Sequence, residues 1–133
     1  MDATGIPLAW TLTGGNRNDV TQLIPLVERI PPVRGKVGHP RRRPDRVTAD
    51  RGYDHDKYRR ELRQRGITSE IARRNTEHGS GLGRLRWSVE RTFAWLHHFK
   101  QLLVRYDRRY EIHGAFLALG CCLVCFRRLR QCS

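Results

Sequence analysis

The spacing of apolar residues predicts three short strands, over residues 6–13, 47–50 and 67–72. The first alternates apolar with small or polar side chains, as a half-buried strand does, and it follows a turn that contains Asp2 and Gly5. The second and third are short apolar runs bounded by turn residues. Each is too short for a helix and is typical of a strand in a small sheet.

Two helices are predicted between these strands. Asp19 and Gln22 have the spacing of a capping box and open the first, which Pro31 and Pro32 end. Asp54 is expected to cap the second, which ends at Gly66. The residues expected on their buried faces are Val20, Leu23, Ile24 and Val27 in the first helix and Tyr58 and Leu62 in the second.

Two further helices are predicted in the last third, from about Arg84 to Leu103 and from about Glu111 onward. Both carry apolar stripes at helical spacing, so we expect the two to pack together. The stripe of the first comprises Val89, Phe93, Leu96 and Leu103, next to Trp95, Phe99 and Leu102. The stripe of the second comprises Ile112, Phe116, Leu119, Leu123 and Phe126.

The order strand, helix, strand, helix, strand predicts an α/β fold in one domain spanning residues 1–133, with the C-terminal helices packed on the sheet. In such folds ligands and metals gather at the carboxyl ends of the strands. Two loops interrupt the pattern: a basic, proline-rich loop over 31–44 and a glycine-rich loop over 73–83. The first is either a solvated linker or a contact for a DNA backbone.

The net charge of the chain indicates its class of binding partner. Lysine and arginine number 26 against 13 acidic residues, which gives a net charge of +13 and a pI of about 10.9. Binding to nucleic acid through release of counterions fits this balance, and a merely solvated basic surface is the alternative. No secretion signal opens the sequence, and the apolar run 115–126 is too short to cross a bilayer. A cytoplasmic protein with no membrane partner is therefore expected.

Cysteine chemistry is a weaker possibility. Cys121, Cys122, Cys125 and Cys132 lie on or just after the last helical pattern, where free thiols pack as small hydrophobic groups. Only His113 is near enough in sequence to complete a zinc site, so metal binding there is not expected.

Two acids stand out against this charge. Asp50 ends the second predicted strand and precedes a glycine turn, whereas Glu90 lies on a helix face with Arg86 and His97. A protein that binds a polyanion gains from acidic residues on its binding face when they hold metal ions that act on phosphates. For Glu90 alone, an ordinary surface ion pair is the alternative. Two-metal chemistry normally needs a third acid.

Around these acids the sequence closely resembles the DDE transposases of bacterial insertion sequences, in the group that includes the IS-four and IS-five families. The matching segments are residues 49–54 and 86–96, with 2–8, 12–19 and 66–68 extending the likeness along the chain. The resemblance implies a ribonuclease-H-like fold and DNA cleavage at element ends by metal-activated water. Strand transfer by the freed 3′-hydroxyl follows, with two Mg²⁺ or Mn²⁺ ions in a complete enzyme.

The resemblance matches Asp50 to the second acid of the family triad and Glu90 to the third. In the related signature Tyr-x2-Arg-x3-Glu-x6-Lys, Arg86 and Glu90 are kept, but Gly83 and His97 stand at the tyrosine and lysine positions. Lys100, one turn beyond, is a candidate for the lysine's phosphate contact. The residues expected to contact DNA are Arg34, Arg41, Arg42, Arg43, Arg73, Arg74, Arg86, Arg91, His97 and Lys100.

The first acid of the triad is expected upstream of the segment that residues 2–5 resemble, so this sequence is expected to be an inactive or partial copy. Asp2 is a candidate substitute, although a turn residue at a terminus is poorly placed for the role. Two alternatives stay open: a non-catalytic DNA-binding remnant or regulator, and a ribonuclease-H-like nuclease unrelated to transposition. DNA at element ends and at the target is the expected partner, at the nucleoid, with a homodimer left open.

Overall fold

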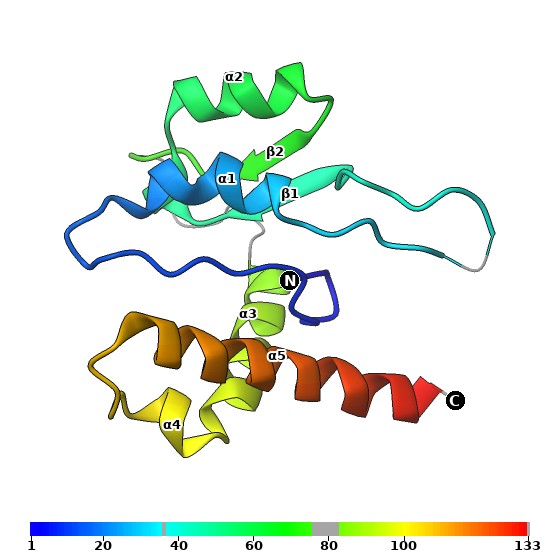
Figure 1. Cartoon of the computed structure of the whole chain (residues 1–133). Coiled ribbons are helices and arrows are strands. Elements are labelled where there is room, and N and C mark those ends of the chain that lie inside the picture. Colours follow the sequence, from blue (N-terminus) through cyan, green and yellow to red (C-terminus); the bar gives the residue numbers. More distant parts are fainter. Residues whose placement is uncertain (36, 76–82, 133) are drawn as a thin grey trace. The chain divides into compact units, whose positions relative to one another are not determined.

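The computed structural model describes residues 1–35, 37–75 and 83–132. The chain forms two compact units, and each is described by itself. One unit comprises Ala9–Leu82 and holds the sheet; the other comprises Met1–Leu8 with Gly83–Ser133 and is mainly helical. The chain is thus a mixture of helices and a small parallel sheet (Figure 1).

The sheet unit is built on two parallel strands, β1 (Arg46–Ala49) and β2 (Thr68–Ile71). Helix α2 (Asp56–Gln64) joins them, because parallel strands need a crossover connection. Their register pairs Arg46 with Thr68 and Ala49 with Ile71, so both strands end at the same edge. Both strands and α2 confirm the helical and strand patterns read from the sequence.

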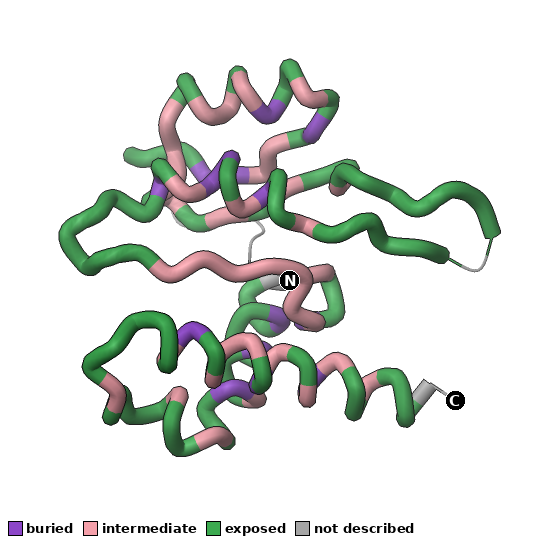
Figure 2. The backbone as a smooth tube through the Cα atoms, in the orientation of Figure 1, coloured by how far each residue is buried: buried purple, intermediate pink, exposed green. Residues whose placement is uncertain are grey.

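The core of this unit lies between the strands and two helices. A short 3-10 helix, η1 (Asp19–Gln22), leads into α1 (Leu23–Glu28). The apolar residues predicted on this first helical segment are all buried, and Leu62 of α2 is fully buried. Figure 2 shows the burial class of each residue along the backbone. The core cluster comprises Leu23, Ile24, Val27, Leu62, Ile67 and Ile71.

Three local predictions for this part were wrong. Residues 6–13 form no strand: they are partly buried along almost their whole length and lack the ladder of hydrogen bonds that a strand needs. The cap of η1 is Asn18, whose side chain accepts a bond from the Val20 N–H at 3.3 Å, rather than an Asp19 capping box. Asp54 does not cap α2, because α2 begins after His55 and the Asp54 carboxylate is engaged elsewhere.

The helical unit contains α3 (Gly83–His97), α4 (Lys100–Leu103) and α5 (Tyr110–Cys132). The sequence predicted one helix over 84–103, but the helix is interrupted at Phe99, whose backbone is extended. The break lets Leu102 and Phe99 pack against Gly120 of α5, where a Cβ atom would lie 2.9 Å and 3.5 Å from them. Glycine at this position therefore permits the close approach of the two elements.

The buried face of α3 also differs from the prediction. Val89 is 39% and Phe93 53% exposed, whereas Ser88 and Thr92 are buried together with Leu96. The N-terminal turn packs on the small side chains: a Cβ atom on Gly5 would lie 2.9 Å from the Ser88 carbonyl oxygen, and Gly5 has a positive φ of 84°. Small residues on α3 thus create the space that the turn fills, and Val89 and Phe93 of the predicted stripe are exposed.

Helix α5 is apolar on two faces, but only one is covered. Gly114, Gly120 and Val124 are buried, whereas Leu119, Phe126 and Leu129 are between 57% and 68% exposed. Over Tyr110–Gln131 the helix is long and apolar enough to cross a membrane by length and composition alone. That is weak evidence, because helices of proteins without a membrane span can pass the same test. The predicted absence of a membrane partner stays a prediction.

The two predicted loops are irregular where they are described. The basic loop is exposed over nearly all of its length and is drawn in green in Figure 2. Its two sides meet at one antiparallel bridge, in which Val33 and Arg41 exchange backbone hydrogen bonds of 2.8 Å. Of the glycine-rich loop, residues 76–82 lie outside the described residues.

Candidate active site

Asp50 lies immediately beyond β1, at the sheet edge where the sequence placed it. Its backbone is extended, and its side chain caps the 3-10 helix η2 (Arg51–Tyr53) by accepting a hydrogen bond from the Gly52 N–H at 3.0 Å. A Cβ atom at position 52 would lie 3.0 Å from the same carboxylate oxygen, so glycine suits the turn. One carboxylate oxygen is therefore fixed while the residue stays exposed.

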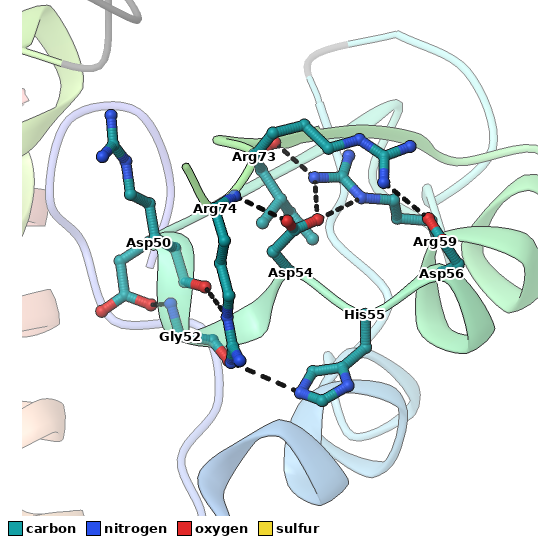
Figure 3. Close-up of polar contacts among 10 residues, drawn as sticks. Asp50, Gly52, Asp54, His55, Asp56, Arg59, Arg73 and Arg74 are labelled. Atoms are coloured by element: carbon teal, nitrogen blue, oxygen red, sulfur yellow. Dashed lines mark hydrogen bonds and ion pairs between the residues drawn. The ribbon is translucent and has the colours of Figure 1, made fainter. Parts of the chain in front are cut away.

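A second carboxylate, Asp54, organises the residues around this turn (Figure 3). One oxygen accepts bonds from Arg59 at 2.6 and 2.9 Å, and the other accepts the backbone N–H of Arg74 at 2.7 Å. Arg59 also donates to the Ile71 carbonyl oxygen at 2.7 Å. The Asp54 and Arg59 side chains are only 8% and 15% exposed. We refer to Asp54, Arg59 and Arg74 as the Asp54 clasp.

The clasp ties the chain leaving β2 to the turn leaving β1. The Arg74 guanidinium donates to the carbonyl oxygens of Arg51 and Gly52 at 3.2 and 3.1 Å, as Figure 3 shows. The Arg74 backbone N–H and the Arg59 guanidinium hold the pKa of Asp54 below its ordinary value. The Asp50 turn is thus held from two sides by bonds within one unit.

Tyr53 and Asp19 complete this neighbourhood. Burial raises the pKa of the Tyr53 hydroxyl, and the charges of Asp19 and Asp50 raise it further. Sequence reasoning missed Tyr53, and it treated Asp19 and Asp54 as helix caps only. Their part in the segments that resemble the transposases was the available signal.

Glu90 has a different setting. It lies on the exposed side of α3, and its carboxylate accepts a hydrogen bond from Arg86 Nε at 3.0 Å. The side chains of Arg86 and Glu90 are 78% and 66% exposed, which is the arrangement of a surface ion pair between residues one turn apart. His97 lies farther along the same helix, where its ring contacts Phe93. Asp50 and Glu90 belong to different units.

The predicted DNA contacts divide by what already engages them. Arg74 is bonded to backbone oxygens, Arg73 donates to Asp56 at 2.8 Å, and Arg41 pairs with Asp45. Arg43 reaches the Arg65 carbonyl oxygen at 3.4 Å. Arg86 pairs with Glu90. The other five predicted contacts are exposed residues: Arg34, Arg42, Arg91, His97 and Lys100. DNA contact by each of them remains a prediction.

Asp2 has a structural role in its turn. One carboxylate oxygen accepts bonds from the N–H and hydroxyl of Thr4, both at 2.8 Å, and from the Ile6 N–H at 2.9 Å. Backbone bonds between Asp2 and Ile6 and between Gly5 and Asp2 close the same turn. These bonds favour the turn over metal binding as the function of Asp2.

The donor chemistry suits a hard divalent ion, but the set of donors is small. Asp50 and Glu90 offer carboxylate oxygens, the ligand type that Mg²⁺ and Mn²⁺ prefer. Over the described ranges, no group of three or more His, Cys, Asp and Glu residues is placed to hold a metal. Burial raises the pKa of the Cys121 and Cys125 thiols, which disfavours the thiolates that zinc needs.

Comparison with known proteins defines the class. Residues 1–125 match the family of transposase DDE domains, and the chain belongs to that family. It is 64% identical over 130 residues to a Burkholderia cepacia protein named as a candidate transposase for insertion sequence element IS402. The match covers 98% of this chain and 62% of that relative. No solved structure matches the chain. The family implies a ribonuclease-H-like fold and the use of divalent metal ions.

Proposed function

We propose that this chain is part of a transposase that cleaves and joins DNA at the ends of an insertion element. The observation that carries the proposal is Asp50, an exposed carboxylate fixed at the carboxyl end of a parallel strand by the Gly52 N–H. The membership of the chain in the DDE family supports the same reaction class. Phosphoryl transfer of this kind depends chiefly on positioned charges, and a rigid strand end supplies such positioning.

In this proposal Asp50 and Glu90 are two metal ligands, and Mg²⁺ or Mn²⁺ is the ion, with two ions in a complete site. When bound, such ions generate a nucleophile from water and offset charge on the phosphate. The second oxygen of Asp50 would hold the ion, and the Gly52 N–H keeps the carboxylate in place. Arg86 bonds one oxygen of Glu90, so the other oxygen would hold the ion, and exchange of the ion pair would make Arg86 available to a DNA phosphate.

Metal binding tests the role of Asp50 without requiring cleavage. We expect Asp50→Asn to weaken Mn²⁺ binding, followed by electron paramagnetic resonance, by roughly tenfold or more. Asp45→Asn is the matched control, because Asp45 is an exposed acid just before β1 and pairs with Arg41. Equal Mn²⁺ affinity in wild type and Asp50→Asn would remove Asp50 from the site.

A second candidate function is a non-catalytic DNA-binding protein derived from a transposase. Two observations favour it: Glu90 is paired with Arg86, and the described residues form no three-ligand cluster. We therefore expect the isolated chain to bind DNA, with affinity falling steeply as salt rises, but not to nick supercoiled plasmid in Mg²⁺. Nicking that requires Mg²⁺ and disappears in Asp50→Ala would refute the non-catalytic proposal.

The remaining proposals concern partners and location. DNA at element ends and at the target is the proposed substrate, and the basic residues along the 31–44 loop are its proposed backbone contacts. We propose a cytoplasmic protein associated with the nucleoid. A homodimer is proposed as the working assembly, and light scattering of the purified chain with and without DNA tests it.

A further inference from the structure

An exposed row of apolar and small residues runs along one side of α5, the longest of the described helices (Figure 1). Its six members are all exposed, and successive members lie alternately three and four positions apart. They are Ile112, Ala115, Leu119, Cys122, Phe126 and Leu129. This alternation is the heptad spacing of a coiled coil, in which one helix packs along another. We call these six residues the α5 seam.

The seam lies opposite the face by which α5 packs within its own unit. That face contains the buried residues Gly114, Gly120 and Val124, and Gly120 closely approaches side chains of α3 and α4. With 3.6 residues per turn, the two sets of positions lie on opposite sides of the helix. A helix that is apolar on both sides is normally covered on both. Among the described residues, side chains cover only the side away from the seam.

The seam residues complement one another when two copies of α5 run antiparallel. Such a pair, centred between residues 120 and 121, has three kinds of layer: Leu119 with Cys122, Ala115 with Phe126, and Ile112 with Leu129. The first two kinds combine a small side chain with a large one, which fills a core without voids. A parallel pair would instead place Ala115 against its own copy and Phe126 against its own copy.

The charges at the ends of α5 favour the same orientation. Arg127, Arg128 and Arg130 gather near its C-terminal end. The N-terminal end is less positive, because Glu111 pairs with Arg109 at 3.9 Å. A parallel pair would bring the two arginine clusters together and align the helix dipoles. An antiparallel pair separates the clusters and sets opposed dipoles side by side.

We propose that the α5 seam is an interface between two copies of this chain, in which the two α5 helices form an antiparallel coiled coil. Such an interface is self-complementary, as two-fold symmetry requires. The inference rests on the homodimer of the proposed function and names the surface that forms it. Helix α5 is already ordered by its packing within the unit, so association does not have to fold it.

Sedimentation equilibrium of the full chain in a reducing buffer tests the interface, and the wild type is expected to dimerise. Leu119→Glu places a charge in the central layers, and we expect it to weaken dimerisation at least tenfold. Leu103→Glu is the matched control, because Leu103 of α4 is 58% exposed and Leu119 is 57% exposed. The two variants change the net charge equally, and the control should dimerise like the wild type.

A second variant tests the orientation. Cys122→Lys alone should also weaken the dimer. In the double variant Leu119→Glu/Cys122→Lys, an antiparallel pair brings each new carboxylate against a new ammonium of the other copy. We therefore expect the double variant to dimerise at least roughly tenfold more tightly than Leu119→Glu. A parallel pair would set like charges together, so a double variant no better than Leu119→Glu rejects the antiparallel interface.

The outcomes separate the interface from the proposed function. A wild-type chain that stays monomeric at every concentration refutes the α5 interface, and DNA binding by that monomer leaves the transposase proposal standing. A wild-type dimer that survives Leu119→Glu keeps the homodimer but overturns the seam as its interface. Binding of phosphatidylcholine vesicles by a monomeric wild type, lost in Leu119→Glu, would assign the seam to a lipid surface instead.

Circular dichroism shows whether each variant folds, and exposed positions on α5 are expected to accept the substitutions. Should Leu119→Glu lose its helical signal, Leu129→Glu replaces it, because Leu129 is 68% exposed and lies in the outermost layer. We expect the same direction of change from Leu129→Glu. Wild-type dimerisation in a folded Leu129→Glu variant would then reject the proposal.

Discussion

The two acids that define the candidate site occupy opposite kinds of surroundings. Asp50 caps its turn by accepting the Gly52 N–H, and this turn is linked to the Asp54 clasp and backed by the apolar core under β1 and β2. Glu90 lies on an exposed helix face, where a single arginine holds it. The first setting fixes a carboxylate through its scaffold, and the second leaves a carboxylate free to exchange partners. If both acids are metal ligands, as proposed, Asp50 is the one held in place by its scaffold and Glu90 the one held by an exposed ion pair.

The largest expected effect is on the free energy of unfolding, which should depend more on the core of the sheet unit than on the exposed face of α3. Leu62→Ala should lower the free energy of unfolding by about 2 to 5 kcal/mol, because Leu62 is fully buried. Phe93→Ala, on the Glu90 helix, should cost less than about 1 kcal/mol because Phe93 is 53% exposed. Urea denaturation measures both. Similar losses for the two variants would show that the α3 face is buried after all.

The next effect is local to the Asp50 turn. Asp54→Asn removes the charge that accepts bonds from Arg59 and from the Arg74 N–H, so we expect the Arg74 amide to exchange hydrogen roughly tenfold faster. The Gly52 amide should follow, because Arg74 links the two segments. Asp56→Asn, in an exposed pair with Arg73, is the control and should leave both amides unchanged. Unchanged exchange at Arg74 would argue against the clasp.

Protonation of Asp54 at low pH should weaken the hydrogen bonds of the Asp54 clasp. The pKa of Asp54 is lower in the folded chain than its ordinary value of 3.8, so its stabilising contribution is complete above that value. The contribution is lost as the pH falls through the lowered pKa of the folded state. The protection factor of the Arg74 amide, which corrects its exchange rate for the intrinsic effect of pH, should fall in that acidic window when followed by NMR between pH 5 and pH 2. In Asp54→Asn this pH-dependent fall should be absent, and its persistence would assign it to another carboxyl group.

The smallest expected change in stability comes from the Arg86–Glu90 ion pair on α3. Arg86→Ala breaks an ion pair whose partners are both more than half exposed, so stability should change by no more than about 0.5 kcal/mol. Mn²⁺ affinity is the informative measurement, because Glu90 freed from Arg86 should bind the ion more readily. A loss of more than about 2 kcal/mol would mean that the pair is a structural element rather than an exchangeable contact.

Much of the sheet unit could be predicted from the sequence because its signals are local. Short apolar runs placed β1 and β2, helical spacing placed α2 and Leu62, and a strand end followed by glycine placed Asp50. These patterns depend on residues within one or two turns of one another. Local spacing was therefore sufficient for the part of the candidate site that lies on the sheet.

The remainder depends on contacts between distant segments. Asp54 has the spacing of a helix cap, but Arg74, twenty residues away, supplies the partner that decides its role. The apolar stripe of α3 predicted the buried face, yet the turn at Gly5 packs on Ser88 and leaves Phe93 outside. Steric fit to a segment far along the chain outweighed the hydrophobic pattern.

The uncovered stripe on α5 affects how this chain behaves in solution. Leu119, Phe126 and Leu129 expose apolar surface on a molecule with a net charge of +13. At low ionic strength the charges keep molecules apart, and added salt screens that repulsion while leaving apolar attraction intact. We therefore expect salt to weaken the proposed DNA binding and to promote self-association of the chain at the same time. Under that proposal, ionic strength selects between a dispersed, DNA-bound protein and a self-associated one.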